Sequence, residues 1–218
     1  MAKLIRFLYS LLIYALAPVG VIVILFYVIR VPTLRSGLAE RFGFISDLSN
    51  QKTIWLHAVS VGETLAAVPL VKALQAKYPQ YRIMVTCMTD TASRRIRTLF
   101  SDSVEHCYAP FDMPDVVSRF LRRLKPELLI IMETELWPNT IAACERRNIP
   151  VILANARLSQ KSANAYKKIS PLAKSMLQSL HAVVAQHKDD ASRFIDLGLP
   201  EQVLTISGNI KFDLTLDE

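Results

Sequence analysis

Residues 53–64, TIWLHAVSVGET, join a short apolar run to the start of an amphipathic segment. The run at Thr53–Ala58 is rich in β-branched and aromatic residues, which are typical of a buried strand. Ser60 and Glu63 stand three positions apart in the pattern of a helix capping box, and apolar residues then recur at three- and four-residue spacing. This stretch therefore predicts a strand, a tight turn and a helix.

The same strand-turn-helix pattern repeats along the rest of the chain. Such alternation predicts an α/β fold, with a Rossmann-like parallel sheet and helices on both faces. Gly198 is expected to end the last helix. The expected strands are Thr53–Ala58, Tyr81–Cys87, Val104–Tyr108, Glu127–Met132, Pro150–Ala154, Ala182–Ala185 and Val203–Ile206, and the expected helices are residues 62–77, 91–100, 114–124, 137–147, 162–180 and 188–197.

A hydrophobic segment precedes this region. Phe7–Ile29 carries no charged side chain, and as a helix it would extend about 34 Å, enough to cross a hydrocarbon core of about 30 Å. Lys3 and Arg6 resemble the start of a signal peptide, but the apolar run is too long for one and no small-residue cleavage site follows. We expect an uncleaved membrane helix, either a span or a deeply placed interfacial helix, because Pro18 and Gly20 could break it.

The amino-acid composition limits the class of protein to which the chain can belong. The 218 residues are 51% hydrophobic and 21% charged, which excludes a disordered protein. We expect an anchor at residues 1–32, a basic amphipathic connector at 33–50, one Rossmann-like domain at 51–213 and the start of a linker at 214–218.

Three widely spaced cysteines without a CxxC pair favour a reducing compartment, and hence the cytoplasmic face of a membrane.

The net charge of +7 favours an anionic partner such as phospholipid or a phosphorylated lipid. Basic residues cluster on predicted helices around Arg94, Arg119 and Lys167, where they could equally form solvated faces. No nucleic-acid-binding motif is present, so nucleic acid is not an expected partner. Neither GxGxxG nor GxxxxGK[ST] occurs, and the histidines lack the spacing of metal ligands, so we expect no cofactor and no metal.

Ligands of such folds bind where the carboxyl ends of strands meet the following loops. In the first such loop, Glu63 is a capping partner of Ser60, a general base, or both. Glu133 and Glu135 follow the fourth strand. They could be a pair of metal ligands, they could include a catalytic acid, or they could be exposed residues at the start of a helix. Because alternate residues point in opposite directions, we expect only Glu133 to face the ligand.

Two basic residues occupy later loops at the same edge. Arg157 follows the fifth strand and Lys211 follows the last one. Each could bring a cation to an anionic substrate, or be an ordinary solvated side chain.

Five ordered motifs stand out along the chain, namely RSGLAERFG at 35–43, HAVSVGET at 57–64, METELWPN at 132–139, NARLS at 155–159 and GNIKFD at 208–213. Together they resemble the motifs of the 3-deoxy-D-manno-octulosonic acid (Kdo) transferases. The resemblance implies the N-terminal half of a GT-B glycosyltransferase that is inverting and metal-independent. It also implies an enzyme on the cytoplasmic side of the inner membrane, which transfers Kdo from CMP-Kdo to the lipid A precursor in lipopolysaccharide synthesis.

The same resemblance implies roles for individual residues. Glu63 is the base that deprotonates the acceptor hydroxyl, and Glu133 and Lys211 match transition-state stabilising positions. The expected substrate-binding residues are Ser60, Gly62, Asn155 and Arg157. Because the family carries a second domain that supplies most of the nucleotide-sugar site, we expect this span to fold without turnover. The alternative is a non-catalytic, membrane-anchored module that binds an anionic lipid or partner through its basic helices.

Overall fold

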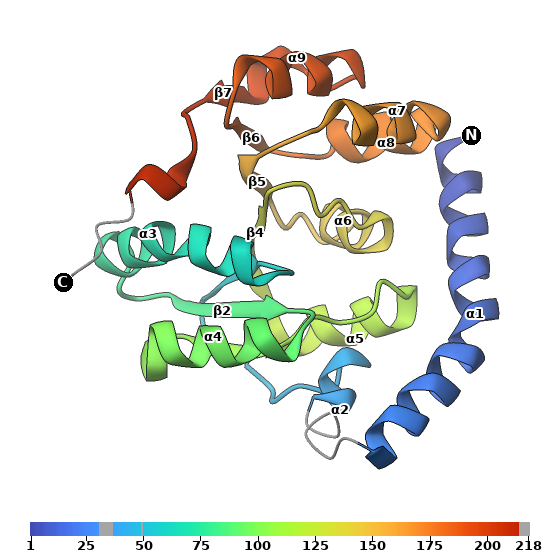
Figure 1. Cartoon of the computed structure of the whole chain (residues 1–218), viewed down its shortest axis with the longest axis vertical. Coiled ribbons are helices and arrows are strands. Elements are labelled where there is room, and N and C mark those ends of the chain that lie inside the picture. The colour runs from blue at the N-terminus through green and yellow to red at the C-terminus, as the bar shows by residue number, and fades with distance from the viewer. Residues whose placement is uncertain (31–36, 49, 214–218) are drawn as a thin grey trace.

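The computed structural model describes residues 1–30, 37–48 and 50–213, which form an α/β domain and a long N-terminal helix (Figure 1). The strands are β1 (Thr53–His57), β2 (Arg82–Cys87), β3 (Glu105–Tyr108), β4 (Pro126–Met132), β5 (Val151–Ala156), β6 (Ala182–Ala185) and β7 (Leu204–Ile206). The α-helices are α1 (Ala2–Arg30), α2 (Leu38–Arg41), α3 (Val61–Lys77), α4 (Asp90–Phe100), α5 (Pro114–Leu124), α6 (Pro138–Glu145), α7 (Gln160–Lys168), α8 (Ser170–Gln178) and α9 (Lys188–Asp196). Short 3-10 turns are η2 (Ser101–Ser103), η3 (Glu201–Val203) and η4 (Ile210–Asp213).

The described strands form one seven-stranded sheet in the order β3-β2-β1-β4-β5-β6-β7, and every neighbouring pair is parallel. All seven predicted strands are confirmed, with ends that differ by two residues at most. The chain first builds outward from β1 to β3 and then returns to place β4 beside β1. The loops after β1 and β4 therefore meet at the point where strand order reverses, which is where open α/β sheets bind ligands.

Helices cover both faces of the sheet, as predicted. On one face, Trp55 of β1 packs on Phe120 of α5 with ring centroids 4.9 Å apart. On the other face, Leu56 of β1 packs in a core with Ile96 of α4. Successive strand residues thus point into two separate apolar layers, both closed to solvent.

One predicted helix is wrong in its length. The expected helix at residues 162–180 is two helices, α7 and α8, which meet at Ile169. Pro171 stands in the first turn of α8, where its missing amide hydrogen costs nothing, whereas inside a continuous helix it would break the hydrogen-bond ladder. Gly198 does end α9, with a φ of +99°.

The hydrophobic N-terminal segment is helical, as predicted, and α1 runs along one side of the domain from α8 to α2 (Figure 1). Hydrogen bonds join its inner side to α5, α6 and the loop before α5, pairing Tyr9 with Asp112, Ser10 with Asn139, and Tyr14 with Asp115. Across the described residues, none of the helices has the length and hydropathy needed to cross a bilayer.

The described part of the predicted connector packs closely on the domain. Residues 33–36 and 49 of the connector and the predicted linker at 214–218 lie outside the described residues. Gly43 has a φ of +79°, and a Cβ there would lie 2.5 Å from the carbonyl oxygen of Val116. Arg119 and Arg123 donate to the backbone carbonyls of Phe42 and Ile45. These two arginines therefore hold the connector and are not part of a solvated basic face.

Candidate active site

Glu63 lies at the N-terminus of α3, and only 5% of its surface is exposed. Ser60 is the N-cap residue, whose hydroxyl accepts a hydrogen bond from the Glu63 backbone amide and donates one to Oε1 of Glu63, at 2.7 Å. Oε2 accepts a hydrogen bond from the backbone amide of Val59 at 2.8 Å. The capping interpretation is thus confirmed, and the cap fixes the Glu63 carboxylate at the carboxyl edge of the sheet.

The environment of Glu63 favours a carboxyl group that gains and loses a proton near neutral pH. Burial raises its pKa from 4.5 to about 7, against the hydrogen bonds from Ser60 and Val59, which favour the ionised form. Negative charge on Glu135 and Glu133 adds to the upward shift. A carboxylate with such a pKa is suited to general base catalysis.

Glu133 and Lys211 form an ion pair beside this group. Nζ of Lys211 lies 3.5 Å from Oε1 of Glu133, and both side chains are partly exposed, at 40% and 29%. Glu133 has a φ of +55°, a left-handed conformation that costs a residue with a Cβ about 1–2 kcal/mol. The structure therefore brings together the three predicted catalytic residues, with an accessible cation among them.

Asn155, predicted to bind substrate, is buried at the end of β5 and holds the segment that carries Lys211. Its Oδ1 accepts a hydrogen bond from the backbone amide of Ile210 at 3.2 Å, and its carbonyl accepts one from Gln186 at 2.9 Å. Among the described residues, none forms a hydrogen bond with the buried Nδ2 of Asn155. In this structure Asn155 therefore positions η4, next to the site.

The other predicted substrate-binding residues lie around the same edge. Gly62 is exposed in the first turn of α3, beside the Ser60 cap. Arg157 is exposed after β5, and its backbone carbonyl accepts a hydrogen bond from Thr134. This bond ties the loop after β5 to the loop after β4.

Two residues outside the predicted set of catalytic and substrate-binding residues also shape the site. The negative charge on Glu135 raises the pKa of Glu63 more than that on Glu133 does, so both carboxylates act on Glu63. Trp137 donates to Glu135 at 3.2 Å, and its indole ring packs edge-on against His57 with centroids 4.6 Å apart. Their sequence signal was the METELWPN motif, whose aromatic residue follows the two carboxylates.

His57 is fully enclosed by this packing. Burial lowers its pKa to about 4, so the imidazole is neutral at pH 7. Its Nδ1 is 2.9 Å from the hydroxyl of Thr86. His57, the last residue of β1, is therefore a neutral packing partner of Trp137.

Comparison with known proteins assigns this arrangement to a family. The family model of 3-deoxy-D-manno-octulosonic-acid transferase (kdotransferase) matches residues 36–214. The chain belongs to the Kdo transferase family. The 3-deoxy-D-manno-octulosonic acid transferase of Haemophilus influenzae is 42% identical over 98% of the chain, and the probable mitochondrial enzyme of Arabidopsis thaliana is 36% identical over 79%. The chain spans 50% and 39% of these two Kdo transferases, about half or less of their length.

Solved structures show the same fold at low sequence identity. The UDP-GlcNAc 2-epimerase of Neisseria meningitidis, bound to UDP-GlcNAc, aligns with a TM-score of 0.55 and 14% identity, over 75% of this chain and 48% of the epimerase. The S. aureus MnaA-UDP co-structure aligns with a TM-score of 0.54 and 16% identity, over 77% of this chain and 49% of that chain. The Kdo transferase chain therefore has the fold of about half of such an enzyme, a GT-B-like half.

Proposed function

We propose that the full-length protein containing this chain transfers Kdo from CMP-Kdo to the lipid A precursor, as an inverting and metal-independent glycosyltransferase. The buried, doubly hydrogen-bonded Glu63 with a pKa of about 7 carries this proposal, together with membership of the family. The donor is expected to bind mainly to a second domain beyond this chain.

In the proposed reaction, Glu63 accepts the proton of an acceptor sugar hydroxyl. The hydroxyl oxygen forms a bond to the anomeric carbon of Kdo while the bond from that carbon to the CMP phosphate oxygen breaks, and the electron pair leaves with the phosphate. Ser60 and Val59 hold the carboxylate in place, so little reorganisation is needed when the proton moves. Each carboxylate oxygen already accepts one hydrogen bond and keeps a further lone pair for the substrate.

Lys211 and Glu133 are proposed to stabilise charge as the reaction proceeds. The ammonium group of Lys211 can approach either the departing phosphate or the Kdo carboxylate, which are both anionic. Glu133, 3.5 Å away, orients Lys211 and offsets positive charge that develops on the sugar ring.

We further propose that α1 lies against the cytoplasmic side of the inner membrane. Its hydroxyl groups face the domain, whereas its exposed side carries large apolar residues, namely Leu4, Phe7, Leu8, Leu11, Leu12 and Leu16. An apolar face of this kind binds the boundary between headgroups and acyl chains. The placement brings the lipid acceptor to Glu63 without its extraction from the bilayer, and phospholipid is then a second partner.

The decisive experiment compares Glu63→Gln with Glu145→Gln in the full-length protein, assayed for Kdo transfer from CMP-Kdo to the lipid acceptor. Glu145 is an exposed carboxylate at the end of α6 and serves as the matched control. Removal of a general base is expected to lower kcat by about 100-fold to 10,000-fold, with the fold intact. If Glu63→Gln stays within a few-fold of the parent, Glu63 is only a helix cap and the base must be another group.

A further inference from the structure

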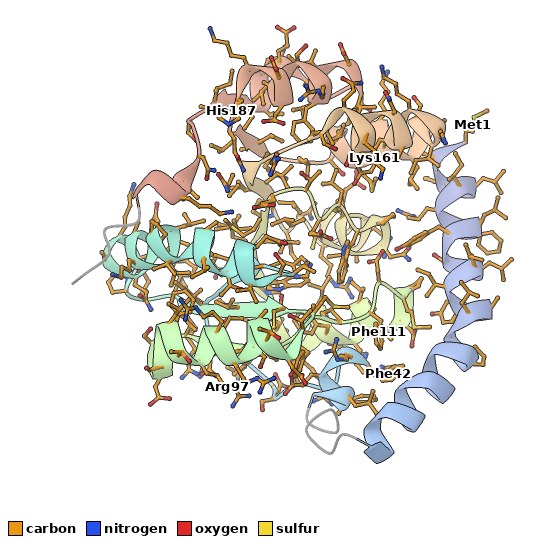
Figure 2. The ribbon with its side chains drawn as sticks, viewed as in Figure 1. Met1, Phe42, Arg97, Phe111, Lys161 and His187 are labelled. Carbon is orange, nitrogen blue, oxygen red and sulfur yellow. The ribbon has the colours of Figure 1, made fainter. Side chains whose placement is uncertain are left out.

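An apolar cavity of about 380 Å³ lies between α1 and the carboxyl edge of the sheet. Loops after β2, β3 and β4 supply Met88, Phe111, Met113 and Trp137, and α1 supplies Ile13 and Ala17. Figure 2 shows Phe42 and Phe111 between the domain and the second half of α1, and their rings pack edge-on with centroids 5.4 Å apart. The size falls within the range of about 300–1,000 Å³ that is usual for small-molecule sites.

The chemistry of the lining suits a hydrocarbon. Asp112 is the one charged side chain among the described residues that line the cavity, and its hydrogen-bonding capacity is already used. Its Oδ2 accepts from Tyr9 and from the amide of Asn139, and its Oδ1 accepts from the amide and hydroxyl of Thr140. A polar ligand would find few free partners there, whereas an acyl chain would lose only its contact with water.

The cavity adjoins the carboxylate proposed as the base. The amide of Met88 donates to the carbonyl of Val59 at 3.2 Å, and the amide of Val59 donates to Glu63. On the neighbouring wall, Trp137 contacts His57 of β1 and donates to Glu135. The wall of the cavity is therefore hydrogen-bonded to the loop that holds Glu63, so the head group of an acyl chain bound here would lie near that carboxylate.

The cavity also reaches the apolar outer side of α1. Leu16 lines it and is nevertheless 58% exposed, next to the exposed Leu12. Gly20 forms another part of the lining, and a Cβ added there would meet no atom within 4 Å. This side of the cavity is therefore open toward the surface that is proposed to face the bilayer.

We infer that this cavity binds one acyl chain of the lipid acceptor and so sets the position of its sugar hydroxyl at Glu63. The inference rests on the proposed function, which supplies the acylated acceptor. In this arrangement the cavity distinguishes acylated from deacylated acceptors, and the residues at the carboxyl edge of the sheet catalyse the transfer.

The test fills the cavity from α1 in the full-length protein. Gly20→Trp and Ala17→Trp place bulk at the lining, and Ile195→Trp places the same bulk on the exposed side of α9 as the control. We expect both cavity variants to raise KM for the acylated acceptor at least tenfold and to leave kcat/KM for a deacylated, water-soluble acceptor within twofold. An unchanged KM for the acylated acceptor in both variants overturns the inference.

A second measurement does not depend on turnover. An acceptor with a photoreactive diazirine in one acyl chain is expected to label Met88, Phe111 or Met113, and Gly20→Trp to reduce this labelling at least fivefold. Labelling confined to exposed residues such as Leu8, or equal labelling by a diazirine phospholipid, overturns the assignment to the acceptor. Labelling of the cavity without any Kdo transfer by the wild-type protein would refute the proposed function and leave acyl-chain binding supported.

Discussion

Glu63→Gln is expected to stabilise the domain above pH 7, although it removes the proposed base. Burial raises the pKa of Glu63 from 4.5 to about 7, and each pH unit of difference corresponds to about 1.4 kcal/mol. The folded state therefore binds the proton more tightly than the unfolded state does. The stability that protonated Glu63 contributes is complete below about pH 4.5 and is lost as pH rises through about 7, a change of about 3 kcal/mol.

Glutamine avoids this loss because it stays neutral. Its carbonyl can still accept from the Val59 amide, and its amide can donate to the hydroxyl of Ser60. Compared with the wild type, the variant should gain up to about 3 kcal/mol in the free energy of unfolding at pH 8 and little at pH 4.5.

Urea unfolding of the chain between pH 4.5 and pH 8.5, followed by the fluorescence of Trp55 and Trp137, measures this difference. Glu145→Gln is the control, since its exposed carboxylate should give a difference close to zero at every pH. A gain for Glu63→Gln that is the same at pH 4.5 and pH 8 would show that burial of the ionised carboxylate is not its cause.

Four further outcomes are expected. The kcat/KM of the full-length protein should rise with pH through about 7 as Glu63 ionises, and a flat profile would argue against a base with that pKa. Lys211→Met should lower kcat about 100-fold in the transfer assay without changing the melting temperature; a loss below threefold would exclude charge stabilisation by this residue. Asn155→Ala should cost about 1–3 kcal/mol in urea unfolding, because the Ile210 amide loses its acceptor; since Asn155 has a φ of +53°, Asn155→Gly separates this loss from the strain of alanine in the left-handed region. Phe120→Ala should cost about 3–5 kcal/mol in the same assay, since the ring is fully buried, and a cost below 1 kcal/mol would contradict its place in the core.

The sequence predicted the sheet well because each strand is a local apolar run between turn residues. It also predicted the capping box at Ser60 and Glu63, whose partners are three residues apart. It could not predict that Asn155 holds the amide of Ile210, because that contact depends on how two distant loops meet at the sheet edge. For the same reason the residues of the Lys211 loop left two interpretations open, a solvated lysine or a cation for an anionic substrate, and did not predict its ion pair with Glu133.

The sequence also could not predict which side of α1 packs on the domain, or that the helix breaks at Ile169. The packing side of α1 could not be assigned, because its apolar residues occur all around the helix and only Tyr9, Ser10 and Tyr14 mark the inner side. The break at Ile169 depends on whether Pro171 falls inside a helix or in its first turn, and the neighbouring apolar pattern is compatible with both.

The bonds from α1 to the domain have a mechanical consequence. They are spread from Tyr9 to Tyr14 and end on Asp112, Asn139 and Asp115, so the helix cannot swivel about a single joint. If α1 lies on the membrane surface, as proposed, Glu63 keeps a constant depth and orientation relative to the lipid head groups. In the proposed full-length enzyme, opening and closing would then be made by the donor domain, which would move over an acceptor domain held in place by α1.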